Sequence, residues 1–311
     1  MSVAPTTTKH AVPTATKSVR RVLSDIVEVL ACPLCGADLT AADDALGCLA
    51  GHSFDIARHG YASLLPGDAH TGTADTQAMT DSRGAFLGAG HFAPVAEAVT
   101  DAVSRTVGEA SGCVVDVGAG TGYYLAQVLD HLPGHTGLAL DISKFAMRRA
   151  ARAHPRMGAA VCDAWRTLPV RSGSAAAVLN IFAPRNAAEF QRILRPEGVL
   201  ISVTPTAKHL QELIEPLGLL RVDEDKAQRL EDQLGSRFER VSSTGVEGVT
   251  TLSHEDVSAV ASMGPSAWHT DGATLQVRIS ALEEPVEVTF SVTVGTYKVK
   301  AGDDSTPTAG S

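Results

Sequence analysis

The sequence predicts an α/β fold, with a Rossmann-like, mostly parallel, seven-stranded sheet behind a small cysteine-rich module near the N-terminus. Apolar runs of strand length alternate with helical segments from about residue 113 to 205. This alternation is typical of a parallel sheet that is covered by helices on both faces. Three cysteines and a histidine gather between residues 32 and 52, ahead of the alternation. We therefore expect a small module in front of one large α/β domain.

Composition divides the chain into four parts. Both ends are rich in small and polar residues, such as the final "AGDDSTPTAGS", and are predicted to be disordered. A polar link rich in glycine and threonine, "GDAHTGTADTQ", follows the cysteine-rich module. The predicted boundaries are 1–21 for the first tail, 22–66 for the module, 67–300 for the large domain and 301–311 for the second tail.

The bulk properties favour an intracellular globular protein. The formal net charge of −9 argues against binding to nucleic acid by overall charge, although a local basic face is compatible with it. One candidate face is Lys144, Arg148, Arg149 and Arg152, which can equally be a solvated helix surface. No apolar run approaches the ~18 residues of a membrane helix, and the N-terminus lacks the apolar core of a signal peptide. We expect a cytoplasmic protein with no membrane partner.

The cysteine-rich module has the ligand spacing of a zinc site. Its residues Cys32, Cys35, Cys48 and His52 form two pairs, with Gly36, Gly47 and Gly51 available for tight turns. Three thiolates and an imidazole suit tetrahedral zinc, and four protein ligands leave no open position for catalysis. A redox pair is the alternative, but it requires the two cysteines to open a helix in a βαβ unit, and none follows here. The sequence therefore predicts a structural zinc ion.

The large domain is expected to begin with helices over 79–107, interrupted at glycines and Pro94. The segments that follow read as strands at 113–117, 134–141, 158–162, 175–181 and 199–205, with helices at 123–129, 144–154 and 187–198 between them. Further strands around a helix come from 238–264 and 285–299. Late strands of this kind often close such a sheet with an antiparallel edge.

A glycine-rich turn follows the first of these strands, in "VVDVGAGTGYY". Its glycines, Gly118, Gly120 and Gly122, have the spacing GxGxG, unlike dinucleotide-binding loops or P-loops, and no lysine follows to hold phosphates. Asp141 ends the next strand, where an acid can bind ribose hydroxyls. These features predict a nucleoside ligand with a non-phosphate arm. A dehydrogenase-type loop is the alternative.

The glycine-rich turn with Asp141 resembles the first two motifs of class I S-adenosylmethionine-dependent methyltransferases. In this order, the segments "CPLCGADL", "GHSFDIARHGYASLL", "FLGAGHFAPV", "LNIFAPRN", "ILRPEGVLISVTP" and "MGPSAWH" resemble the RlmA family of 23S rRNA guanine-N1 methyltransferases. The tylosin- and mycinamicin-resistance branch is the most similar one. The resemblance runs from about residue 29 to 298.

The resemblance implies a cofactor, a metal and a set of site residues. The cofactor would be S-adenosylmethionine, contacted by Gly120 and Thr121 in the loop and by His209 after the fifth strand. An aromatic ring would cover it at Phe92, where the family often has tyrosine. The four cysteine and histidine residues of the module would bind zinc. A phenolic contact is lost at position 92, whereas stacking is kept.

The resemblance also implies the reaction. Methylation of guanine N1 requires its proton to leave, and the target base must leave its stack to reach a buried methyl group. The turn "NIFAPRN", with Asn180 and Pro184, is interpreted as a wall of the base pocket. Asp163 and His91 are conceivable proton acceptors, but the catalytic residue is not identified.

The expected partner is 23S rRNA, with its target guanine in a hairpin loop of domain II and macrolide resistance as the consequence. The cysteine-rich module would read the RNA, with Arg58, His59 and Lys144 as phosphate contacts. The alternative role of the module is to buttress the fold or a homodimer. A small-molecule methyltransferase and a non-catalytic RNA-binding protein are the rival functions.

Overall fold

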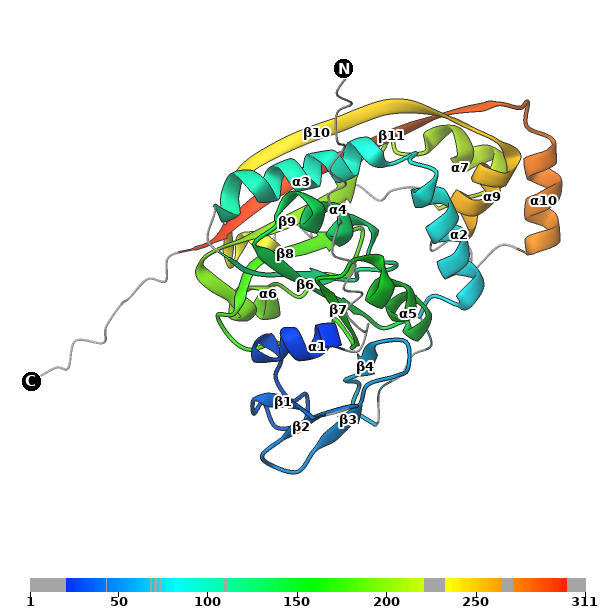
Figure 1. Cartoon of the computed structure of the whole chain (residues 1–311). Helices are drawn as coiled ribbons and strands as arrows, with labels where there is room; N and C mark the ends of the chain where they lie inside the picture. Colours follow the sequence, from blue (N-terminus) through cyan, green and yellow to red (C-terminus); the bar gives the residue numbers. More distant parts are fainter. Residues whose placement is uncertain are drawn as a thin grey trace, which may run out of the picture.

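The computed structural model describes residues 21–42, 44–67, 69, 72, 74–108, 111–220, 233–264 and 271–300. The two predicted tails therefore lie almost entirely outside the described residues. The chain builds an eight-stranded sheet with the order β10-β11-β9-β8-β5-β6-β7-β4 and a separate three-stranded sheet, β1-β2-β3 (Figure 1). None of the described helices is long and apolar enough to cross a membrane.

The centre of the large sheet confirms the predicted alternation. Its parallel strands are β5 (Gly112–Val117), β6 (His135–Asp141), β7 (Met157–Val161), β8 (Ala175–Ile181) and β9 (Leu194–Pro205). The helices after them are α4 (Tyr123–His131), α5 (Lys144–Ala153), α6 (Ala187–Ile193) and α7 (Gln211–Leu217). Every residue of β7 and β8 is buried, as expected of strands covered on both faces.

The predicted antiparallel edge is also present. Strand β11 (Val286–Val299) pairs antiparallel with β9, and β10 (Phe238–Leu252) pairs antiparallel with β11. Helices α9 (His254–Ser262) and α10 (Gly272–Ser280) lie between these two strands in the chain. One boundary differs from the prediction, because α6 ends at Ile193 and residues 194–198, expected to be helical, begin β9. Pro196 offers no amide to continue a helix.

The fold class is confirmed, but the sheet has one strand more than the seven predicted. The additional strand is β4 (Tyr61–Ser63), which comes from the cysteine-rich module and pairs in parallel with β7. A three-residue strand is too short to show a periodic pattern in the sequence. The module and the large domain therefore share one sheet.

Two hydrophobic cores flank the sheet. One face is covered by α2 (Gln77–Gly88), α3 (Ala93–Val107), α4, α5, α7, α9 and α10. The other is covered by α6 and by the N-terminal elements α1 (Arg21–Asp25) and η1 (Val27–Val29), together with β1 (Leu39–Ala42) and β2 (Ala45–Cys48). Leu23 and Ile26 pack on Gly158 of β7, where a Cβ atom would lie 2.5 Å from Ile26 Cδ1. The module thus buttresses the sheet.

The order of the strands places the topological switch point of the sheet at the end of β5. From β5 the chain proceeds through β6 and β7 on one side and then crosses to β8 on the other. The loops after β5 and β8 therefore leave the sheet in opposite directions. Ligands of open parallel sheets bind at such a switch point, beyond the carboxyl ends of the strands.

Candidate metal centre and cofactor site

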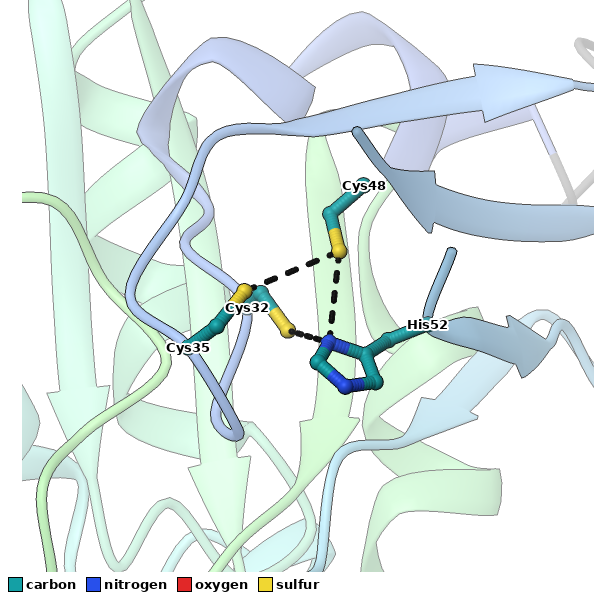
Figure 2. A group of neighbouring side chains, drawn as sticks. All are labelled: Cys32, Cys35, Cys48 and His52. Carbon is teal, nitrogen blue, oxygen red and sulfur yellow. Dashed lines mark hydrogen bonds between the residues drawn. The ribbon is translucent and has the colours of Figure 1, made fainter. Parts of the chain in front are cut away.

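The four predicted metal ligands converge from two turns of the module. Cys32 and Cys35 precede β1, whereas Cys48 ends β2 and His52 directly precedes β3 (Ser53–Asp55). Their ligand atoms all lie within 4.8 Å of one another (Figure 2). The Sγ atoms of Cys35 and Cys48 are 3.7 Å apart, and His52 Nδ1 lies 3.5 Å from Cys32 Sγ and 3.4 Å from Cys48 Sγ.

These separations fit a zinc ion. Bond lengths of about 2.3 Å to sulfur and about 2.0–2.1 Å to nitrogen give tetrahedron edges of about 3.8 Å between sulfurs and about 3.6 Å between sulfur and nitrogen. Desolvation raises the pKa of the Cys48 thiol, but hydrogen bonds with the backbone of His52 and Ala50 outweigh it and lower the pKa to about 7. This favours the thiolate that zinc requires. Three sulfurs and one nitrogen complete the coordination, so the site is structural.

Both turns end in a glycine with left-handed backbone. Gly36 donates to the carbonyl of Cys32 at 2.8 Å, and Gly51 donates to the carbonyl of Cys48 at 3.0 Å. Their φ angles are +72° and +84°, which strain any residue with a Cβ atom. Gly47, which was expected to share this role, lies inside β2 and is not among the positive-φ residues. That part of the prediction is wrong.

The glycine-rich turn joins β5 to α4 at the switch point. Gly118, Gly120 and Gly122 all have positive φ, between +54° and +80°. A Cβ atom on Gly118 would overlap the side chain of Ala183, which follows β8. The loop after β5 is thus packed tightly against the loop after β8. Thr121, expected to contact the cofactor, lies between the last two glycines.

Asp141 lies beside this turn, as predicted. Its Oδ2 accepts a hydrogen bond from the amide of Gly120 at 3.0 Å, and its Oδ1 accepts one from the amide of Ser143 at 2.8 Å. Burial raises the pKa of Asp141, while these two bonds oppose the rise. Each carboxylate oxygen has a second lone pair, so acceptor capacity for ribose hydroxyls is left.

Asp116 is the buried acid of the site. It is the second-last residue of β5. Its Oδ1 has no hydrogen-bond partner among the described residues. Burial, with a smaller contribution from the negative charge of Asp141, raises the pKa of Asp116 to about 8. An unpaired buried carboxyl oxygen is costly, so this atom fits a site that is completed by a donor or cation of a ligand.

Arg83 of α2 is a site residue that the sequence did not reveal. A Cβ atom on Gly120 would lie 3.2 Å from Arg83 Cδ, so the arginine lies against the glycine-rich turn. Its Nη2 donates to Asp75 Oδ2 at 2.8 Å and to the carbonyl of Met263 at 2.7 Å. The positive charge of Arg83 lowers the pKa of Asp141, after larger effects of burial and backbone hydrogen bonds. A cation that is paired with Asp75 therefore lies near Asp141 at the glycine-rich turn.

An aromatic cluster lies beyond the carboxyl end of β8. Phe92 and His209, both predicted site residues, have ring centroids 5.5 Å apart. The ring of Phe182 stacks on His209 with centroids 5.7 Å apart and planes 25° from parallel. Burial lowers the pKa of His209 to about 4, so the ring is neutral near pH 7. Its Nδ1 accepts from the amide of Ser291 at 3.2 Å, which assigns the ring proton to Nε2.

Phe182 is a strained and accessible residue within this cluster. Its φ angle is +53°, in the left-handed region that β-carbon residues avoid. It is also 40% exposed, unusual for a phenylalanine beside a core. A strained backbone that presents an apolar ring is typical of functional sites. Nothing in the sequence marks this conformation.

Asn180 lies two residues before Phe182 and is fully buried. Its Nδ2 donates to the carbonyl of Pro184 at 2.8 Å and to that of Val117 at 3.4 Å. These two bonds fix the orientation of the amide. Its Oδ1 has no partner among the described residues and is available as an acceptor.

The two residues considered as proton acceptors, His91 and Asp163, lie in different parts of the fold. His91 is held from both sides, because its Nδ1 lies 3.0 Å from Thr250 Oγ1 and its Nε2 lies 3.1 Å from Asp256 Oδ1. This arrangement ties the turn between α2 and α3 to β10 and α9. Asp163 follows β7 and accepts a hydrogen bond from the amide of Trp165 at 2.9 Å. His91 is joined to the aromatic cluster through Phe86, whose ring centroid lies 4.9 Å from that of His91 and 5.0 Å from that of Phe92.

Two family models match parts of this chain, and several solved structures resemble it. The family model described as "RlmA, N-terminal" matches residues 30–71, and the model described as "Methyltransferase domain" matches residues 114–198. Among solved structures, geranyl diphosphate methyltransferase in complex with SAM is 15% identical, with a TM-score of 0.42, and the match covers 66% of this chain and 84% of that one. The YcgJ protein of Bacillus subtilis is 12% identical, with a TM-score of 0.44, covering 66% of this chain and 99% of that one.

Curated relatives extend over nearly the whole chain. A 23S rRNA (guanine(748)-N(1))-methyltransferase of Streptomyces fradiae is 48% identical over 270 residues, which is 86% of this chain and 96% of the relative. A protein of Micromonospora griseorubida, assigned as a 23S rRNA (guanine-N(1)-)-methyltransferase, is 50% identical over 292 residues, covering 88% and 98%. The chain therefore belongs to the RlmA family of 23S rRNA (guanine-N1)-methyltransferases, with S-adenosylmethionine as cofactor and zinc as structural metal.

Proposed function

We propose that this enzyme methylates N1 of a guanine in a hairpin loop of domain II of 23S rRNA and thereby gives resistance to tylosin- or mycinamicin-type macrolides. The observation that carries the proposal is the 48% identity to the Streptomyces fradiae enzyme, whose name specifies guanine 748. A methyl group on the Watson–Crick edge prevents normal pairing and adds bulk where a macrolide sugar would lie. The protein would act in the cytoplasm, where its rRNA substrate is found.

The cofactor would lie across the glycine-rich turn. Bound S-adenosylmethionine supplies an electrophilic methyl group. Asp141 would accept hydrogen bonds from the ribose, beside the amide of Gly120 that it already binds. The unpaired Oδ1 of Asp116 would accept from the cationic amino end, and Arg83 would bind the carboxylate. The site thus offers an acceptor to the amino group of the cofactor and a cation to its carboxylate.

The target guanine would enter between the cofactor and the aromatic cluster. Phe182 would stack on the flipped base, because aromatic platforms bind bases of single-stranded loops. The free Oδ1 of Asn180 would accept a hydrogen bond from the N1–H and N2–H edge of guanine. Neutral His209 would back Phe182 and, with Phe92, keep water out. An amide oxygen does not take the N1 proton, which must pass to a separate base as the methyl group is transferred, so these residues position the base.

Expression in a macrolide-sensitive bacterium tests the biological claim. We expect a raised inhibitory concentration of tylosin- or mycinamicin-like macrolides and a new reverse-transcriptase stop in the domain II loop. Both effects should disappear in Gly120→Val, whose side chain would meet Arg83. Resistance without a stop, together with methyl transfer to the free macrolide, would instead support the small-molecule methyltransferase.

A further inference from the structure

The module and α5 meet at a cluster of positive charge. The turn between β3 and β4 carries Arg58 and His59, and β4 lies beside α5 (Figure 1). Arg58 Nε lies 3.2 Å from His59 Nε2, and Arg152 Nη2 of α5 lies 2.5 Å from His59 Nδ1. Both ring nitrogens of one histidine therefore face guanidinium groups. The fold brings together basic residues that are far apart in the chain.

Helix α5 extends this cluster along one face. Lys144, Arg148 and Arg152 are spaced by four residues, which places them on one side of the helix, and all three are exposed. The opposite side of α5 is buried in the core, through Ala146, Met147, Ala150 and Ala151. We call Arg58, His59, Lys144, Arg148 and Arg152 the basic surface.

The arginines of the basic surface form no salt bridges with acids in the part of the chain that the structure describes. Among the described residues, neither Arg58, Arg148 nor Arg152 forms an ion pair with an acid, whereas the neighbouring Arg149 is paired with Asp81 of α2. Desolvation and then the charges of Arg148, Arg152 and Arg58 lower the pKa of His59. Positive charge therefore exceeds negative charge at this point, on a protein whose formal net charge is −9, although the acids Asp81 and Asp130 line the adjoining groove.

A groove runs beside the basic surface and borders the glycine-rich turn at one residue, Thr121. A cavity of about 650 Å³ lies between α2, α4 and α5. Its walls include Arg148 and Arg152, and also Thr121, which follows Gly120 in the glycine-rich turn. A chain bound along the groove would have its backbone at the arginines and its neighbouring nucleotide near the cofactor loop.

We propose that the basic surface binds backbone phosphates of 23S rRNA next to the target nucleotide. The inference rests on the proposed function and identifies where its substrate is held. Guanidinium groups bind phosphate oxygens through two parallel hydrogen bonds, and phosphate contacts fix register without reading sequence. An acidic protein needs such a local cluster to bind a polyanion. The module would thus contribute to RNA binding through the turn before β4.

The test compares the wild-type chain with Arg58→Ala/Arg148→Ala/Arg152→Ala, using an unmodified 23S rRNA transcript. Two properties are measured: the KM for RNA at saturating cofactor, and the dependence of RNA affinity on salt concentration. We expect the KM to rise at least tenfold at little-changed kcat. The slope of log affinity against log salt should fall by roughly 2, since each phosphate contact contributes about 0.7–0.9. Arg105→Ala, an exposed arginine on α3, is the matched control.

Three further measurements make the outcome decisive. Zinc content and S-adenosylmethionine affinity equal to wild type show that the triple variant is folded. Arg148→Lys/Arg152→Lys keeps the charge and should keep most of the salt slope. A folded triple variant with wild-type KM and slope would overturn the basic surface as an RNA site. A wild-type protein that binds cofactor but methylates no rRNA would instead refute the proposed function.

Discussion

The Oδ2 atom of Asp141 accepts a hydrogen bond from the amide of Gly120 at 3.0 Å, and this bond joins the acid after β6 to the glycine-rich turn after β5. Two features that the sequence marks separately are therefore one structural unit. The same carboxylate also accepts from the amide of Ser143, at the start of α5. Changes at Asp141 should affect both the shape of the turn and the ribose contact.

Asp141→Asn should weaken cofactor binding without unfolding the protein. Hydrogen bonds to a charged group contribute about 1.5–3 kcal/mol, so we expect the affinity for S-adenosylmethionine to fall by roughly 10- to 100-fold. Titration calorimetry measures this directly. Asp101→Asn, an exposed acid on α3, should bind as wild type does. Equal affinities of the Asp141 variant and wild type would place the ribose elsewhere.

Asp116 should make the cofactor-free protein less stable as the pH rises. Burial raises the pKa of Asp116 to about 8 from its ordinary value near 4, so the folded state keeps a proton that the unfolded state releases. The stability present below about pH 4 is therefore lost progressively up to about pH 8. Asp116→Asn cannot ionise and avoids this loss. The variant should gain a few kcal/mol over wild type across this range, at about 1.4 kcal/mol per pKa unit. Denaturant titrations at several pH values would contradict the assignment if the difference between the two proteins stayed constant.

Cys35→Ser should remove zinc and destabilise the N-terminal module, because metal binding and folding are coupled at such sites. Metal analysis should find one zinc per wild-type chain and markedly less in the variant. Because β4 of the module extends the large sheet, we expect the thermal transition of the whole protein to fall as well. Cys162→Ala removes a buried thiol outside the zinc cluster and should leave the zinc content unchanged. Full metal occupancy in Cys35→Ser would exclude this residue as a ligand.

Phe182→Gly should lose activity without losing stability. Glycine relieves the left-handed backbone strain at φ +53°, which costs a residue with a Cβ atom about 1–2 kcal/mol. Loss of stacking with the target base costs about 1–3 kcal/mol, so kcat/KM for rRNA should fall by roughly 5- to 150-fold. Phe182→Tyr keeps the ring and should keep most of the activity. Chemical unfolding and single-turnover methylation, measured on the same preparations, separate the two effects. Full activity in the glycine variant would refute the stacking role.

The features predicted from sequence are those that residue type and spacing define locally. The paired cysteines, the glycine-rich turn and the buried strands each depend on neighbours within a few residues, and their placement followed the prediction. The features that were not predicted from the sequence depend on packing between residues far apart in the chain. Arg83 lies on a helix with no local signal, and it becomes a site residue only because α2 lies over the turn at Gly120. The contact between His59 and Arg152 depends on the pairing of β4 with β7. A strand of three residues is too short to be predicted from the sequence.

The methylated position is identified by mapping the product of the purified enzyme on 23S rRNA. After incubation with S-adenosylmethionine, nucleoside analysis should detect 1-methylguanosine, and primer extension should stop at a single guanine in the domain II loop. Gly120→Val should give neither signal. A methyl group on a different atom of guanine, a stop outside that loop, or full product formation by Gly120→Val would contradict the account.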